Sequence, residues 1–180
     1  GIDRVAANDI WSIGKNDNSS AVLALGPADY KKFLSKDFGF EDRFFLIGRS
    51  NATADFPYVL PGPDDTWGGT WGTSGWRTHQ INILFALKSF PAGGQWKLVI
   101  DLVDAHPGKS LLKVGVNELM YEKFLLKGVS DASLTGGGSA AGEKILEIPL
   151  RDGVIRQGGN GITITVLEGS WVVFDHVRLE

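Results

Sequence analysis

The chain has 180 residues, 43% of them hydrophobic and 22% charged, with a formal net charge of -3, which suits one globular domain over residues 1–180 and argues against disorder. The weak acidity, without any run of lysine or arginine, argues against a nucleic-acid-binding or membrane-surface protein, and no apolar run reaches the ~18 residues of a membrane span. The absence of cysteine excludes disulfides, thiolate catalysis and cysteine-ligated zinc, and it fits a bacterial protein that is secreted or held at the cell surface.

Period-two alternation of apolar residues, typical of β-strands, recurs along most of the chain. In chain order it predicts strands over residues 10–13, 22–25, 43–47, 80–87, 96–102, 111–116, 144–148, 161–166 and 170–179. One short helix is expected over residues 27–36, where Pro27 can take the first helical position. Because strands do not alternate with helices, the pattern favours an all-β fold, an antiparallel β-sandwich of jelly-roll type with neighbouring first and last strands.

Two features bear on domain organisation. The glycine-rich segment 134–142 (LTGGGSAAG) is short and has strands on both sides, so we interpret it as a surface loop within one domain. The chain opens at Gly1 without an initiator methionine or a signal peptide, and it closes at Glu180 directly after a strand. We therefore expect a module excised from a larger, exported enzyme.

The end of the chain carries a distinctive pattern: residues 159–166 read GNGITITV and residues 169–180 read GSWVVFDHVRLE. This ending resembles the C-terminal domain of rhamnogalacturonan lyases, polysaccharide lyase family 4, whose last strand carries aromatic-Asp-x-aliphatic-Arg-Leu-Glu. Residues 10–17 (IWSIGKND) and 111–117 (LLKVGVN) agree in order. The resemblance implies a jelly-roll domain like a carbohydrate-binding module, placed after a catalytic domain and a fibronectin-like domain. Since that family's catalytic residues lie in the N-terminal domain, it also implies binding without cleavage.

Residues 65–77 (DTWGGTWGTSGWR) place three tryptophans among glycine, serine and threonine. A pyranose ring has an apolar face that stacks on aromatic rings and a rim of hydroxyls that form hydrogen bonds. Trp67, Trp71 and Trp76 are therefore candidate sugar platforms, and glycines would let a ligand approach the backbone closely. The alternative is that these indoles fold back and cover an open end of the core.

Polar residues near this stretch could read the sugar. Arg77, Arg49 and His79 are candidates for contacts with hydroxyls or a uronate carboxylate, because a guanidinium matches a carboxylate with two parallel hydrogen bonds. Asp65, with Asp64 beside it, could accept hydrogen bonds from a vicinal diol. For each residue taken alone, a solvated surface position is the alternative.

Asp175 raises a separate question, because alternation places its carboxylate on the same side of a strand as the apolar Val173 and Val177. A buried carboxylate needs a partner. One possibility is a structural calcium ion, which related jelly-roll modules often hold with a late aspartate and backbone carbonyls. The other, which we favour, is a hydrogen-bonded pair with an arginine or with backbone amides near the start of the chain.

These observations predict a non-catalytic carbohydrate-binding module that targets a plant or algal cell-wall polysaccharide, pectic or otherwise uronate-containing, for an attached polysaccharide-degrading enzyme. One alternative is a structural module that packs on the catalytic domain and binds no sugar. A third is a stand-alone lyase or hydrolase, in which Asp65 with His79, or Glu118 with Glu122, would serve as acid and base. No nucleophile elbow, paired metal-binding histidines or phosphate loop supports that third reading.

Overall fold

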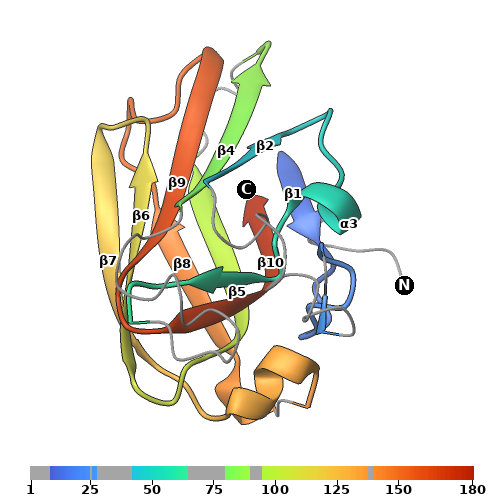
Figure 1. The fold of residues 1–180 in the computed structure, drawn as a ribbon. Coiled ribbons are helices and arrows are strands. Elements are labelled where there is room, and N and C mark those ends of the chain that lie inside the picture. The colour runs from blue at the N-terminus through green and yellow to red at the C-terminus, as the bar shows by residue number, and fades with distance from the viewer. Residues whose placement is uncertain (1–8, 25, 28–41, 65–79, 90–94, 138–139) are drawn as a thin grey trace.

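The computed structural model shows two β-sheets stacked face to face (Figure 1). It describes residues 9–24, 26–27, 42–64, 80–89, 95–137 and 140–180. The strands are β1 (Trp11–Gly14), β2 (Arg43–Leu46), β3 (Val59–Pro61), β4 (Gln80–Leu87), β5 (Lys97–Ala105), β6 (Lys109–Val116), β7 (Met120–Lys127), β8 (Lys144–Pro149), β9 (Gly158–Glu168) and β10 (Trp171–Leu179). The short helical segments are α3 (Ala52–Asp55), η3 (Asp131–Thr135) and η4 (Ala140–Gly142). None of these segments has the length and apolar character that crossing a membrane requires.

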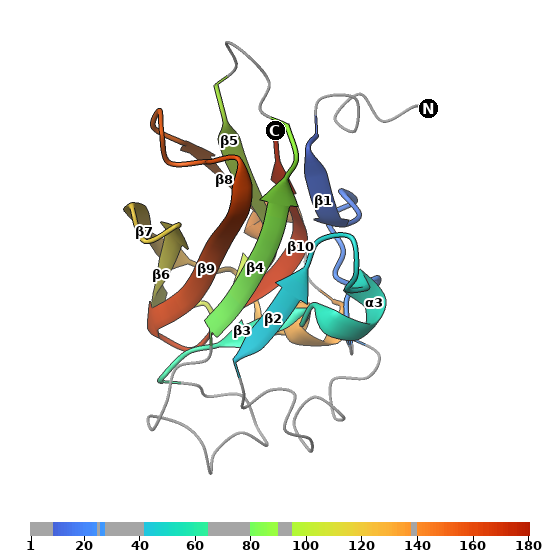
Figure 2. The same ribbon diagram turned by 90° about the horizontal axis from the view of Figure 1, so that it is seen from above.

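Sheet I has the strand order β1-β10-β5-β8, with β3 also paired to β10, and sheet II has the order β2-β4-β9-β6-β7. Apart from β6 and β7, which pair with each other, successive strands alternate between the sheets. The strands β1, β5, β8 and β10 face β4, β6, β7 and β9, which is the jelly-roll arrangement of two Greek keys. The predicted β-sandwich is therefore confirmed. The first and last strands pair, with Trp11 opposite Leu179, and only β2 and β4 pair in parallel among the described strands (Figure 2).

The alternation read from the sequence decides which side chains fill the space between the sheets. Along β9, Ile162, Ile164 and Val166 are fully buried, whereas Thr163 and Thr165 between them are only partly buried and lie on the outer side. A slip of one residue would exchange these two sets, so burial of one face fixes the register. The outer face of sheet II is therefore polar along its centre.

Two local features differ from the sequence-based expectations, and a third expectation concerns residues outside the described ones. Residues 22–25 form no strand in their described part, since Ala24 makes only an isolated bridge with Pro57. The strands β3 and β7 were not expected: β3 spans three residues, and β7 is an edge strand whose inward side carries the exposed Glu122 between the partly buried Met120 and Phe124, which interrupts the alternation. The expected helix 27–36 lies outside the described residues beyond Pro27.

Candidate functional site

One row of residues crosses the outer face of sheet II from edge to edge. The pairing register places side by side one residue from each strand in the order β2, β4, β9, β6 and β7, namely Phe44, Asn82, Thr163, Gly115 and Tyr121. The two end positions are aromatic and each is 60% exposed. The row thus has a ring at each end and polar or small residues between them.

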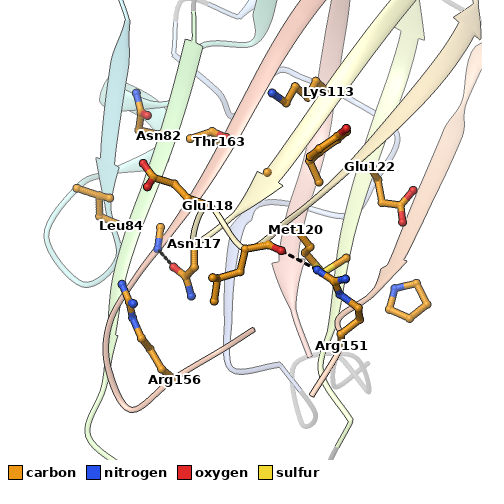
Figure 3. A pocket seen from close by; sticks show the side chains of 15 residues that line it. Asn82, Leu84, Lys113, Asn117, Glu118, Met120, Glu122, Arg151, Arg156 and Thr163 are labelled. Atoms are coloured by element: carbon orange, nitrogen blue, oxygen red, sulfur yellow. Dashed lines mark hydrogen bonds between the residues drawn. The ribbon is translucent and has the colours of Figure 1, made fainter. Parts of the chain in front are cut away.

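A depression of about 1080 Å³ lies over this face (Figure 3). Its lining comes from β4, β9, β6, β7, the β6–β7 turn, the end of β8 and the loop before β9. It includes Asn82, Leu84, Lys113, Gly115, Tyr121, Arg151, Arg156 and Thr163. A second depression of about 540 Å³ is lined by Leu46 and Arg49 on the β2 side. Both are lined by Leu84, Arg156 and Gly161, so the two depressions adjoin. Together they touch all five strands, and we call them the sheet II trough.

Glycine forms part of the trough floor. A methyl group added at Gly115 would lie 2.7 Å from Oγ1 of Thr163, and one added at Gly161 would contact the Leu84 side chain at 3.4 Å. Neither glycine has the positive φ that would require glycine for backbone reasons. The missing side chains therefore make room for neighbouring side chains, Gly115 for the Thr163 hydroxyl and Gly161 for Leu84.

Tyr121 lies at the β7 end of the trough under two ammonium groups. Nζ of Lys113 is 5.0 Å from the ring centroid and Nζ of Lys123 is 5.7 Å from it. The two lysines are direct cross-strand neighbours, an arrangement in which like charges repel. An anionic group bound beside the ring would relieve that repulsion.

Two arginines line the trough and are held by backbone carbonyls. Nε of Arg156 donates to the carbonyl of Gly159 at 2.8 Å, and Nη2 of Arg151 donates to the carbonyl of Leu119 at 2.6 Å. The terminal Nη groups of Arg156 have no hydrogen-bond partner among the described residues, and the side chain is exposed. A guanidinium oriented in this way can offer a fork of donors to a carboxylate.

Asn117 fixes the β6–β7 turn against the start of β9. Its Nδ2 donates to Oδ1 of Asn160 at 2.8 Å and to the carbonyl of Val154 at 2.7 Å, while its Oδ1 accepts from the amide of Gly161 at 2.7 Å. Asn160 in turn accepts from the amide of Arg156 at 3.0 Å. This network connects the turn to the segment that carries Arg156.

The turn itself holds backbone strain. Asn117 and Glu118 have φ values of 52° and 58°, and the amide of Leu119 donates to the carbonyl of Val116 at 3.0 Å. This is a type I′ turn, whose second central position favours glycine. Glu118 lines the trough (Figure 3), and strain of this kind clusters at functional sites.

The sequence-predicted sugar contacts fall mostly outside the described residues: Trp67, Trp71, Trp76, Arg77, His79 and Asp65. Their role as platforms and polar contacts stays a prediction. Arg49 is described, exposed and part of the trough lining. Asp64 accepts a hydrogen bond from the amide of Gly169 at 3.4 Å. Glu118 and Glu122, considered as an acid and base, both line the larger depression and point away from one another in Figure 3.

Asp175 is 1% exposed and lies where the pairing of β10 with β5 is irregular. Its carboxylate accepts hydrogen bonds from the amides of Asp17 at 3.4 Å, Asn18 at 3.0 Å and Ser19 at 3.2 Å. These are backbone amides near the start of the chain, as in the favoured alternative. The pKa of Asp175 is raised to about 6, because burial, with a smaller contribution from the nearby Asp17, outweighs the three amide hydrogen bonds that favour the carboxylate.

Calcium at Asp175 stays a prediction. Calcium takes six to eight oxygen ligands, and the three hydrogen-bond partners that the structure gives this carboxylate are N–H donors. Within the described part of the chain, no three His, Asp or Glu side chains gather as a metal site would need. We therefore assign Asp175 as a structural anchor that holds residues 17–19 against the last strand.

Sequence reasoning did not single out Gly115, Tyr121 or Arg156. Alternation in the strand that became β6 does place Lys113 and Gly115 on its outward side. It could not show that β7 and β9 flank them, because strand order depends on pairing over long sequence separations. For β7 there was no alternation to read at all.

Comparison with known proteins gives distant structural similarities and one family match. No curated protein matches the chain. Similar solved structures include TmCBM61 in complex with β-1,4-galactotriose (21% identity, 56% of this chain and 61% of that chain, TM-score 0.35), an exo-β-1,3-galactanase from Phanerochaete chrysosporium (13%, 56% and 21%, 0.37) and the Bacillus thuringiensis δ-endotoxin Cry8Ea1 (14%, 73% and 26%, 0.41). The chain spans less than two thirds of each of these chains. The model of the CBM-like domain III of polysaccharide lyase family 4 matches residues 9–179, and the chain therefore belongs to that family.

Proposed function

We propose that this domain is a non-catalytic module that binds polysaccharide in the sheet II trough. The observation that carries the proposal is the trough itself: a depression of about 1080 Å³ with glycine at its floor and an exposed ring, Tyr121, at one end. Sugar rings stack on aromatic faces while their hydroxyls need hydrogen-bonding groups. Asn82 and Thr163, which lie in the same row, supply such groups.

The charges around the trough favour an acidic glycan. The chain has a net charge of -3, yet Lys113, Arg151 and Arg156 line the larger depression against Glu118 and Glu122, and Arg49 lies at the other end. Carboxylates of a uronate-containing polysaccharide, pectic material first among them, would pair with these cations. The affinity should then fall as salt is added, because exposed charges are screened.

Membership of polysaccharide lyase family 4 supports a role within a larger enzyme. In that role the module keeps a secreted or cell-surface bacterial enzyme on plant or algal cell-wall material, and a neighbouring catalytic domain cleaves it. The residues described here would then contribute affinity and leave bond cleavage to that domain. Incubating the purified domain with pectin tests this point, since release of unsaturated uronides would identify a lyase.

A second candidate, a structural module that packs on its catalytic partner, rests on one observation. Several of the most exposed apolar side chains lie on the outer face of sheet II: Phe44, Leu46, Leu84 and Leu125. Exposed apolar surface of this kind also marks contacts between domains. The two candidates differ in whether the isolated domain binds glycan.

Titration calorimetry with pectic polysaccharides tests the proposal on the wild type and on Tyr121→Ala. Loss of one stacking ring should cost about 1–3 kcal/mol of binding, by analogy with bases on aromatic side chains. The matched control is Ile145→Ala on β8, because Ile145 is 54% exposed but belongs to sheet I. We expect both variants to melt like the wild type and only Tyr121→Ala to lose affinity. Unchanged binding by Tyr121→Ala would exclude the trough, and the absence of any glycan binding would favour the structural candidate.

A further inference from the structure

We infer that the sheet II trough binds an internal segment of about five sugar units that lies across the strands. This inference rests on the proposed function and adds how the ligand is oriented, how long it is and which part of the polysaccharide is recognised. It follows from the register of the five strands and from where the trough begins and ends.

The length of the trough comes from strand spacing. Five strands contribute to the face, in the order β2-β4-β9-β6-β7, and neighbouring strands lie about 4.8 Å apart, so the outer two are separated by about 19 Å. One pyranose unit advances a glycan chain by about one strand spacing. A chain crossing the strands therefore places about one sugar over each strand.

The direction of the ligand follows from the positions of the two adjoining depressions. The larger one reaches Tyr121 on β7 and the smaller one reaches Leu46 and Arg49 at β2 and the turn after it. Both β2 and β7 are edge strands of sheet II. The trough thus runs from one edge of the sheet to the other, and a polysaccharide can enter over one edge and leave over the other. A site for a chain end would instead need a wall across its path.

Binding contacts occur along the whole trough, so affinity should accumulate with chain length. The β7 end offers the Tyr121 ring with the ammonium groups of Lys113 and Lys123. The β2 end offers the exposed guanidinium of Arg49. Between them, Asn82 and Thr163 line the larger depression and offer hydrogen-bonding groups to the chain.

Calorimetry with a length series of rhamnogalacturonan backbone oligosaccharides, from the disaccharide to the octasaccharide, tests the inference. We expect the affinity to rise by about fivefold per added unit, the equivalent of one net hydrogen bond, and to level off near the pentasaccharide. Removing either end contact, with Arg49→Ala or Tyr121→Ala, should make the affinity level off at a shorter chain, whereas the control Ile145→Ala should keep the wild-type length dependence.

A second measurement tests recognition of an internal segment. The octasaccharide is blocked at its reducing end with a bulky fluorophore in one sample and left free in another, and both should bind equally. Equal affinity for the disaccharide and the octasaccharide, or loss of binding on blocking the end, would overturn this inference and leave polysaccharide binding in the trough intact. If neither the oligosaccharides nor the polysaccharide bind, this inference and the proposed function both fail.

Discussion

Asp175 offers a test of how a buried carboxylate supports this sandwich. Replacing it with alanine removes the acceptor for three backbone amides, those of Asp17, Asn18 and Ser19. Leaving such groups without their partner typically costs about 1–3 kcal/mol of unfolding free energy. The sheet II trough should be unaffected, since Asp175 lies on β10 in sheet I. We therefore expect Asp175→Ala to lower stability and to leave glycan affinity nearly unchanged.

The pH dependence gives the sharper result. Burial raises the pKa of Asp175 from its ordinary 3.8 to about 6, so between these values the folded chain holds a proton that the unfolded chain releases. The contribution of this carboxyl group to the unfolding free energy is then fully present below about pH 4 and is lost as the pH rises to about 6. The difference between the two pKa values corresponds to up to about 3 kcal/mol.

Urea denaturation of the wild type and Asp175→Asn across this pH range measures the effect, because asparagine has a similar shape and does not titrate. Groups common to both proteins cancel, among them Glu180, whose pKa is lowered by its hydrogen bond to Lys97. The wild type should lose stability relative to Asp175→Asn as the pH rises. A relative gain would refute the reasoning, since it would mean that the amides outweigh burial. Melting with a chelator should change nothing, and a lower melting temperature would instead indicate bound calcium.

Two further predictions concern the trough and the tryptophan segment. Glu118→Gly should stabilise the domain by about 1 kcal/mol, because glycine adopts the left-handed backbone conformation of this position without steric strain. Thermal melts should then show a melting temperature about 2–4 °C higher. A lower melting temperature would mean that the Glu118 side chain stabilises the turn. If Trp67, Trp71 and Trp76 are sugar platforms, at least one alanine substitution should cost about 1–3 kcal/mol of binding free energy with little change in melting temperature. If all three substitutions instead lower the melting temperature and leave binding intact, the three indoles cover the core.

Local sequence patterns determined much of the fold. Alternation in residues 161–166 and 80–87 placed the strands β9 and β4 and decided which side chains face the core, because successive residues of a strand point to opposite faces. The ending FDHVRLE, together with residues 10–17 and 111–117, indicated the family. Alternation failed for β7, because the charged Glu122 lies on its inward side and the apolar Leu125 is exposed on its outward side.

Tertiary structure alone decided the candidate site. The sheet II order β2-β4-β9-β6-β7 brings together Phe44, Gly115 and Thr163, which are far apart in the sequence, and no local pattern specifies such pairing. The same holds for Asp175: alternation showed that its carboxylate needed a partner, but its partner Ser19 lies 156 positions away. The sequence alone indicated that the buried carboxylate needs hydrogen-bond donors. Which groups donate to it was determined only by the pairing of the last strand with the first.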